Sequence, residues 1–268
     1  ILVSTLMGGM SGSNLADASM DAKMLVPQMV RKGYSNAFSS VVTAFSAIIT
    51  PLIPPGIAMI LYGSLANISI GKLFVAGFGP GILLCIALMI MVHIISKKRG
   101  YKPSRDSAAT PSEFFDALKK AFLPLLLPLV IIGGIRIGIF TPTEAGSAAV
   151  VYALFLGLIV YREMGFKEFV AGLKETVTGT CGIMLIVGAA SAFSWILTRE
   201  KIPQLFMEFI LANISNKYIF LIVVNLFLLI VGMFVEGNAA MIILVPLLAP
   251  TAAAYGIDEI QFAMTVIF

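Results

Sequence analysis

Residues Gly8–Ser19 read GGMSGSNLADAS, and this polar stretch lies between two apolar runs, ILVSTLM before it and MDAKMLVPQM after it. It holds three glycines, three serines, one asparagine and one aspartate. A helix that ends inside a membrane leaves backbone N–H and C=O groups without partners, and each such group is costly in hydrocarbon. If the chain crosses a membrane, this stretch therefore has to line a polar cavity or hold an ion.

The composition places the chain in a membrane. Of its 268 residues, 59% are hydrophobic and 12% are charged, and the mean hydropathy is +1.00, whereas soluble domains carry about 25% charged residues. The apolar runs are long and continuous, which predicts helices rather than the alternating strands of a barrel. We therefore predict an all-α integral membrane protein. The sequence has no nucleotide-binding motif and no zinc-type cysteine spacing.

The candidate spanning segments are 38–66, 73–96, 121–140, 144–161, 176–197 and 218–231. The net charge of +4 comes from Lys and Arg in short segments between them, chiefly 97–105 and 162–174. This bias predicts that those two segments lie in the cytoplasm, and it does not indicate nucleic-acid binding. The chain starts and stops within apolar sequence and has no initiator methionine, so we expect a fragment of a longer protein.

An internal repeat relates the beginning of the chain to its end. The two segments align without a gap, and the matched pairs are Gly9 with Gly232, Met10 with Met233, Ala16 with Ala239, Pro27 with Pro250, Gly33 with Gly256 and Phe45 with Phe268. Glycine and proline dictate backbone shape, so these matches predict similar turns. Corresponding Gly/Pro-interrupted apolar segments in two halves of a membrane protein indicate a transporter binding site.

Two further breaks support this interpretation. TPLIPPG, Thr50–Gly56, has three prolines, each of which removes a backbone donor, so a discontinuous helix with free carbonyls near 47–50 is predicted. These carbonyls, and the carbonyls and hydroxyls near Ser11–Asn14, can bind Na⁺, a cation that prefers oxygen. The N-terminus of the helix that starts near Asn14 can face an anion. Glu236–Asn238 holds the equivalent place in the repeat, and a Glu beside a helix break is a functional candidate.

These motifs resemble the DctM-like large membrane subunit of tripartite ATP-independent periplasmic (TRAP) transporters. The stretches that carry the resemblance are, in chain order, GGMSGSNLADAS, then Pro27, Met29, Gly33 and Tyr34, then ITPLIPPG and ILYG, then SIGKLFVAGFGPGILL (69–84), GIFTPTEAGSAAVVYA (138–153) and GMFVEGNAAMIILVPLLAPTAAAYGID (232–258). Each motif alone is weak, whereas their combination and order along nearly the whole chain are specific.

The resemblance implies an inverted-repeat, elevator-type transporter with re-entrant hairpins and proline-broken helices, in the inner (cytoplasmic) membrane of a bacterium or archaeon. Residues 1–66 would form the first hairpin and broken helix of the transport domain, and 67–120 a spanning helix with a basic cytoplasmic connector. Residues 121–175 would form two scaffold-type spanning helices. Residues 176–268 would hold the second repeat, with its hairpin and the start of its broken helix.

The implied function is import of a small organic acid anion, such as a C4-dicarboxylate or sialic acid, with Na⁺ as coupling ion and with neither organic cofactor nor enzymatic activity. The implied partners are a DctQ-like small membrane subunit and a periplasmic substrate-binding protein. The residues expected to bind substrate are Ser13, Asn14, Asp17, Pro54, Pro55, Gly56, Glu236 and Asn238. The residues expected to bind sodium, mostly through backbone carbonyls, are Ser11, Gly12, Ser13, Ala47, Thr50, Gly232 and Gly237.

Two alternatives stay open at this point. A sodium/dicarboxylate carrier that needs no binding protein would also be built on hairpins. GMSG, within Gly9–Gly12, matches the G-x-S-G nucleophile motif of rhomboid intramembrane proteases, whose chemistry needs a histidine to activate the serine. The only histidine is His93, close to the basic segment at Lys97, so it is predicted near the cytoplasmic boundary and out of reach of a serine at mid-membrane.

Overall fold

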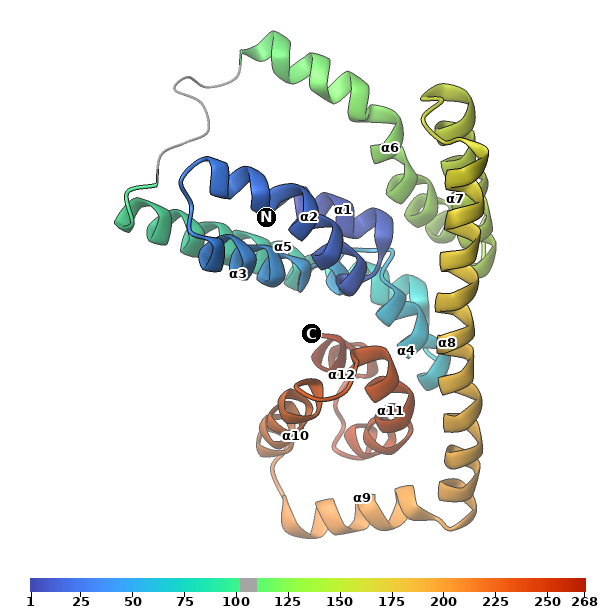
Figure 1. Ribbon diagram of the computed structural model, residues 1–268. Coiled ribbons are helices and arrows are strands. Elements are labelled where there is room, and N and C mark those ends of the chain that lie inside the picture. The colour runs from blue at the N-terminus through green and yellow to red at the C-terminus, as the bar shows by residue number, and fades with distance from the viewer. Residues whose placement is uncertain (102–109) are drawn as a thin grey trace. The chain divides into compact units, whose positions relative to one another are not determined.

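The computed structural model describes residues 1–101 and 110–268, with the side chains in those ranges except those of Met10, Ser194 and Thr198. Within the described residues the chain is helical and has no strand, as predicted (Figure 1). It forms two compact units, and each is described by itself: the first is Ile1–Ile57 with Phe74–Tyr161, and the second is Ala58–Leu73 with Arg162–Phe268. The predicted basic connector includes 102–109, which lie outside the described residues.

The first unit contains the predicted hairpin. Its elements are α1 (Leu2–Ser11), α2 (Asn14–Arg31), α3 (Asn36–Ala47), the 3₁₀ turn η1 (Thr50–Leu52), most of α5 (Ile70–Lys98), α6 (Pro111–Ile137), α7 (Pro142–Phe155) and the π-turn η2 (Leu156–Val160). Helix α2 packs against α1, α3 and η1, and α6 packs against α7. Helices α1, α2 and α3 lie side by side (Figure 1).

The second unit contains the second half of the repeat. Its elements are α4 (Ile57–Ala66, of which only Ile57 belongs to the first unit), α8 (Phe166–Arg199), α9 (Ile202–Asn213), α10 (Lys217–Gly232), α11 (Gly237–Ala254) and α12 (Glu259–Ile267). A buried cluster that includes Phe220, Leu248 and Phe262 joins α10, α11 and α12. The ring of Phe220 stacks on that of Tyr255, with centroids 4.7 Å apart.

Two helices begin with the same capping device. The Thr110 hydroxyl accepts a hydrogen bond from the N–H of Glu113, whose carboxylate accepts one from the Thr110 N–H, and Thr141 and Glu144 form the same arrangement. A proline follows each cap, where its missing N–H costs nothing because that group has no partner inside the helix. These caps set the first residues of α6 and α7 at Pro111 and Pro142.

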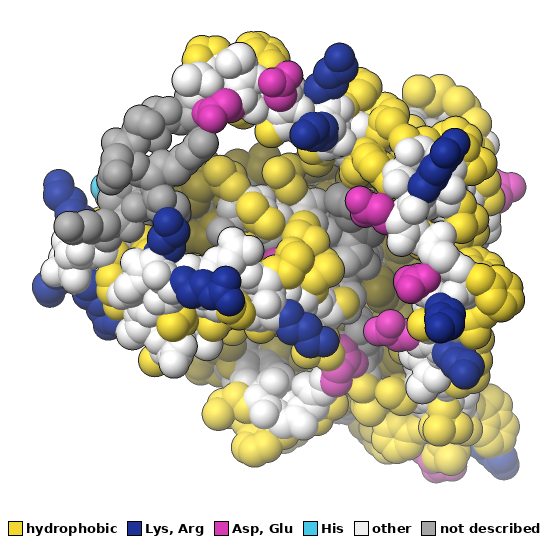
Figure 2. All heavy atoms as spheres, turned by 45° about the horizontal axis from the view of Figure 1, so that its top comes forward, with side chains coloured by type: hydrophobic (Ala, Val, Ile, Leu, Met, Phe, Trp, Pro, Cys, Tyr) yellow, Lys and Arg dark blue, Asp and Glu magenta, His cyan; other side chains and the backbone are white. Residues whose placement is uncertain are grey.

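Five helices of the described residues are long and apolar enough to cross a membrane: Ile70–Lys98, Pro111–Ile137, Pro142–Val160, Phe166–Leu197 and Gly237–Ala254. A sixth candidate is the pair Asn36–Leu52 and Ile57–Ala66, bent by 41° at the predicted proline break. Many large apolar side chains are exposed on these helices, and Figure 2 shows hydrophobic side chains over much of the face in view. Exposed apolar surface of this extent fits contact with lipid.

One predicted span is too short. Helix α10, Lys217–Gly232, has 16 residues, which give a length of about 24 Å. The hydrocarbon core of a bilayer is about 30 Å thick. The prediction of a full span at 218–231 is therefore wrong, and the segment has the length of one arm of a re-entrant hairpin.

The predicted repeat is confirmed in the helix boundaries. Asn14–Arg31 and Gly237–Ala254 each have 18 residues and start and end at matched positions of the alignment. The glycines that follow them, Gly33 and Gly256, are also matched, and both have positive φ, 88° and 68°. The helices after these glycines, α3 and α12, again start at matched positions.

The matched helices are also capped alike. The Ser13 hydroxyl accepts a hydrogen bond from the N–H of Ala16 at the start of α2. The Glu236 carboxylate accepts one from the N–H of Ala239 at the start of α11. Each cap satisfies an N–H that would otherwise have no partner in the first turn.

Candidate functional site

The polar stretch of the first hairpin is a turn between two helices. Helix α1 ends at Ser11, and Gly12 takes a left-handed conformation with φ 65° while its N–H donates to the carbonyl of Gly8 at 3.0 Å. Ser13 caps α2, which starts at Asn14 as predicted. Only glycine takes this backbone conformation without strain. The predicted role of Gly12 in the turn is confirmed.

This turn, which we call the first tip (Gly9–Asp17), contacts the proline break Thr50–Gly56. The N–H of Ile57 donates to the carbonyl oxygen of Gly12 at 3.1 Å. A Cβ atom on Gly12 would lie 2.6 Å from the carbonyl oxygen of Pro55. The two segments therefore meet at backbone distance, which a larger residue at Gly12 would prevent.

The same close approach continues one turn back along α1. A Cβ atom on Gly8 would lie 2.8 Å from Thr50 Oγ1 and 2.9 Å from Thr50 Cα. The small residues of GGMSG thus let α1 approach η1 closely. The break itself is also tight, because a Cβ atom on Gly56 would lie 2.6 Å from the carbonyl oxygen of Pro51.

The break leaves carbonyl oxygen atoms without their usual donors. Ala47 is the last residue of α3, and its carbonyl would normally accept from the residue four positions later, which is Pro51 and has no N–H. The carbonyl of Thr50 accepts from the N–H of Ile53 at 3.2 Å, a 3₁₀ bond. The oxygen donor set that the sequence predicts near 47–50 is therefore chemically suited to a hard cation.

A buried polar cluster lies behind the first tip. Asp17 and Asp21 are completely buried, and Thr50 Oγ1 donates to Asp17 Oδ2 at 2.6 Å. Ser4 Oγ is hydrogen-bonded with Asp21 Oδ2, and Ser46 Oγ lies 2.9 Å from Ser4 Oγ. Asp17 thus fixes η1 against α2 and has no exposed surface through which to contact a substrate in this arrangement.

Sequence reasoning missed Ser4, Asp21 and Ser46 as members of this cluster. One signal was present: Asp17 and Asp21 are four residues apart, which puts both on one face of a helix. The partner serines lie on two other helices, α1 and α3, and only the packing of those helices brings them to Asp21.

The other residues predicted at the first tip have exposed side chains with local hydrogen bonds. Ser11 Oγ accepts from the N–H of Ser13 at 3.3 Å. Asn14 Oδ1 accepts from the N–H of Leu15 at 2.9 Å. Ser11 and Asn14 are exposed and Ser13 is half-buried, so their hydroxyl and amide groups remain accessible to a ligand.

The residues predicted at the second tip lie in the second unit. Gly232 ends α10, and Gly237 is the first residue of α11. Glu236 accepts from the N–H of Ala239 at 3.0 Å and from Asn238 Nδ2 at 2.8 Å. All four of Gly232, Glu236, Gly237 and Asn238 are exposed or half-buried, and their hydrogen bonds organise the start of α11.

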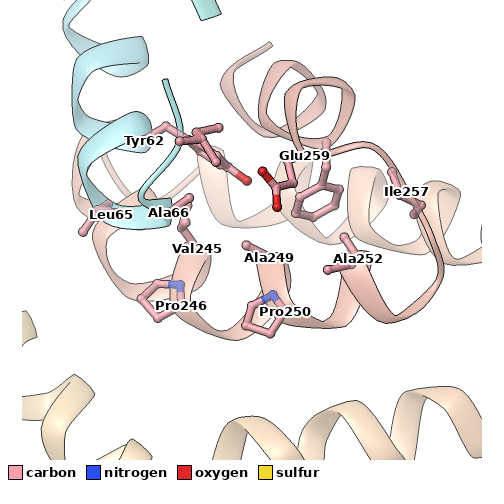
Figure 3. A pocket seen from close by; sticks show the side chains of 13 residues that line it. Tyr62, Leu65, Ala66, Val245, Pro246, Ala249, Pro250, Ala252, Ile257 and Glu259 are labelled. Carbon is pink, nitrogen blue, oxygen red and sulfur yellow. The ribbon is translucent and has the colours of Figure 1, made fainter. Parts of the chain in front are cut away.

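The second unit also contains a cavity of about 280 Å³ between the end of α4, helix α11 and helix α12. Its lining is apolar except for Tyr62 and Glu259, and Figure 3 shows the Tyr62 hydroxyl pointing toward the Glu259 carboxylate. Pro246 and Pro250 of α11 lie on one wall. None of the predicted site residues lines this cavity.

The protease alternative finds no support in the geometry. His93 lines a hollow together with Leu2 and Val3, at the start of α1. Ser11 is the last residue of the same helix, about 14 Å further along its axis. A serine nucleophile needs its activating base within hydrogen-bond reach. His93, on α5, lies beside the start of α1, whereas Ser11 is at its end.

Comparison with known proteins agrees with the resemblance. The whole chain, residues 1–268, matches the family model "Tripartite ATP-independent periplasmic transporter, DctM component". It is 45% identical over 267 residues to the sialic acid TRAP transporter large permease protein SiaM of Vibrio cholerae, covering 100% of this chain and 62% of that protein.

Two further relatives are the sialic acid TRAP transporter permease protein SiaT of Haemophilus influenzae (38% identical, 97% of this chain and 42% of that protein) and the C4-dicarboxylate TRAP transporter large permease protein DctM of Pseudomonas aeruginosa (36% identical, 100% of this chain and 62% of that protein). The chain thus spans less than two thirds of the length of each of these relatives.

Proposed function

We infer the function from the family to which this chain belongs, the DctM component of tripartite ATP-independent periplasmic transporters. We propose that it is part of a large permease subunit that imports a small organic acid anion across a bacterial inner membrane. Sialic acid and C4-dicarboxylates, which the names of the relatives specify, are both carboxylates, so a carboxylate is the proposed substrate class.

The observation that carries this proposal is the backbone contact between the first tip and the proline break. Two interrupted helices meet there, with exposed hydroxyls on one side and carbonyls deprived of donors on the other. In an apolar membrane, such backbone needs a polar ligand. The proposed ligand is Na⁺ as coupling ion, held by oxygen atoms of Ser11, Gly12, Ser13, Ala47 and Thr50, with Gly232 and Gly237 proposed for the second tip.

The substrate carboxylate is proposed to bind beside this ion. The N-terminus of α2 carries a partial positive charge, and Ser13 and Asn14 lie there with accessible side chains. Pro54, Pro55 and Gly56 would form the opposite wall. Glu236 and Asn238 are proposed separately, as the substrate-binding residues of the second tip. Asp17 would act as a positioning residue, because its buried carboxylate holds Thr50.

The remaining parts of the proposal follow from the family. A DctQ-like small membrane subunit would join the large subunit, and a periplasmic binding protein would deliver the substrate. The two hairpins and their broken helices would move as a transport domain against a scaffold in an elevator mechanism. Each of these proposals concerns a whole large permease subunit, and this chain spans less than two thirds of the length of such a subunit in its relatives.

Substrate uptake by proteoliposomes that contain the full-length subunit and its small partner tests the proposal. Uptake of radiolabelled sialic acid or succinate is measured with and without an inward Na⁺ gradient, and with and without the cognate binding protein. We expect uptake only when both are present. Uptake with Na⁺ alone would favour a carrier that needs no binding protein, and uptake unaffected by Na⁺ would overturn the sodium coupling.

A matched pair of serine variants tests whether a hydroxyl at the first tip affects the Na⁺ dependence of uptake more than an exposed hydroxyl elsewhere does. Ser11→Ala removes an accessible hydroxyl at the tip, and we expect a several-fold higher Na⁺ concentration for half-maximal uptake. Ser191→Ala removes an exposed hydroxyl whose bond is to its own helix, at Val187, and it should leave the Na⁺ dependence unchanged. Equal behaviour of the two variants would speak against a sodium site at the tip.

A further inference from the structure

Among the residues that the structure describes, no Lys, Arg or His pairs with the buried carboxyls of Asp17 and Asp21. Both carboxyls have no exposed surface, and each has one oxygen, Oδ1, without a hydrogen-bond partner. Both residues lie on α2. The elements that pack against α2 are α1, α3 and η1, and the sequences of these three elements contain no Lys, Arg, His, Asp or Glu. Two ionised carboxylates one turn apart repel each other, and burial of an unpaired charge is strongly unfavourable. The pair therefore needs a positive charge from elsewhere.

The fold itself does not require carboxyls at these positions. In the repeat, Asp17 corresponds to Ala240 and Asp21 to Leu244, on a helix of the same length and the same boundaries. Ala240 is buried as well. Helix α11 thus accommodates apolar residues at both places, so the acidic pair is a chemical property of the first half alone.

A count of hydrogens shows where a positive charge fits. Three polar contacts form a line: Asp21 Oδ2 with Ser4 Oγ, Ser4 Oγ with Ser46 Oγ at 2.9 Å, and Ser46 Oγ with the carbonyl of Thr43 at 2.8 Å. Each contact needs one hydrogen, and the two serine hydroxyls supply only two. With Asp21 ionised, one contact would bring two oxygen lone pairs together.

We propose that Asp21 binds a proton and completes this line as its first donor. The carboxylic acid then donates to Ser4, Ser4 donates to Ser46, and Ser46 donates to the Thr43 carbonyl. The remaining oxygen of Asp21 is a neutral carbonyl, which costs less to bury without a partner than a charged oxygen does.

This inference rests on burial and on the hydrogen count, and it does not depend on the proposed sodium coupling. It is tested by infrared absorption spectroscopy on the full-length subunit with its small partner at neutral pH, in a detergent that has no ester carbonyl. The C=O stretch of a protonated carboxyl is separate from the amide and carboxylate bands and shifts in deuterated water. We expect such a band in the wild type and in Asp17→Asn, and its loss in Asp21→Asn.

The controls make each outcome decisive. Spectra are recorded in Na⁺-free and in Na⁺-containing buffer, and the band should be present in both. If the band disappears on addition of Na⁺, the ion replaces the proton and the inference is overturned. It is also overturned if the wild type has no such band, or if Asp21→Asn retains it.

A second measurement guards against misfolding of the variant. The amide of Asn at position 21 can donate to Ser4 as a protonated carboxyl does, so Asp21→Asn should unfold at nearly the wild-type temperature. Asp21→Leu introduces the residue found at the matched position of α11, Leu244. It leaves Ser4 without its donor at position 21, so this variant should unfold at a clearly lower temperature. If Asp21→Asn were as destabilised as Asp21→Leu, the proposed donor role would be wrong.

Discussion

The N–H of Ile57, the first residue of α4, donates to the carbonyl oxygen of Gly12 at the hairpin turn, over 3.1 Å. The first N–H groups of a helix have no partner within that helix, and the last carbonyls have none either. This bond uses one orphan group from each of two interrupted helices. Tip and break are therefore held to each other directly and are expected to move as one body.

Substitution of Gly12 should destabilise the hairpin for two separable reasons. Gly12→Ala puts a Cβ 2.6 Å from the Pro55 carbonyl oxygen and forces a side chain into positive φ, whereas at Gly33 φ is positive but the space is open. A left-handed conformation costs a non-glycine residue about 1–2 kcal/mol. We expect the unfolding temperature in detergent to fall most for Gly12→Ala and less for Gly33→Ala.

The control for this series is Gly79→Ala, in the interior of α5, where φ is ordinary and no atom lies within 4 Å of the new Cβ. It should be neutral or slightly stabilising, because alanine favours helix over glycine by about 1 kcal/mol. An equal loss for Gly12→Ala and Gly33→Ala would show that the contact with Pro55 contributes nothing.

Loss of the Thr50 hydroxyl should destabilise the first unit. Thr50→Val keeps the shape of the side chain but removes the donor to Asp17, which leaves both oxygens of that buried carboxyl without partners. Such a loss costs on the order of 1–3 kcal/mol, and more if the group is charged. The free energy of unfolding of the full-length subunit in denaturant measures it.

Thr251→Val is the matched control for this prediction. Thr251 is equally buried, but its hydroxyl donates only to the Leu247 carbonyl of its own helix. Because that carbonyl keeps its backbone partner in the helix, the substitution should cost less than Thr50→Val. A comparable loss of unfolding free energy at the two sites would mean that the bond from Thr50 to Asp17 contributes no more stability than a bond within one helix.

The two matched caps should contribute similar amounts. Ser13→Ala and Glu236→Ala each remove a side chain that accepts a backbone N–H at the start of an 18-residue helix, and loss of an N-cap costs about 1 kcal/mol. Hydrogen exchange should accelerate by roughly fivefold at Ala16 in the first variant and at Ala239 in the second, in line with that loss. Acceleration throughout either helix would indicate instead that the cap controls the folding of the whole element.

Tyr101, outside the spanning part of α5, provides a pH-dependent probe. Hydrogen bonding with the Ser35 hydroxyl, and then with Arg99, lowers the pKa of Tyr101, because these groups stabilise the phenolate. Ser35→Ala should therefore raise the pKa of Tyr101, as measured by alkaline absorbance titration, with Tyr101→Phe used to assign the signal. Ser40 is an exposed serine on α3, the helix that Ser35 caps, and Ser40→Ala should leave the titration unchanged.

The local chemistry of single segments made much of this fold predictable. Gly12 permits the left-handed turn and the prolines of Thr50–Gly56 interrupt the helix, so the turn and the break could be placed from the residues alone. Hydropathy predicted five of the membrane-length elements but overestimated α10, because apolarity does not distinguish a full span from the arm of a hairpin.

The acidic cluster could not be predicted in the same way. Asp21 obtains its partners from Ser4 on α1 and Ser46 on α3, and the pairing depends on how three helices pack. The division of the chain into four functional segments, and the assignment of ligand atoms at the two tips, remain predictions.

The chain carries its own uncharged counterpart of α2. Helix α11 has the same length, the same cap position and the same glycine after it, with alanine and leucine where α2 has aspartates. The two helices thus share one architecture but differ in what their positions require. A substitution near α2 can leave a buried carboxyl without its partner, whereas the matched positions of α11 have no polar side chain to lose.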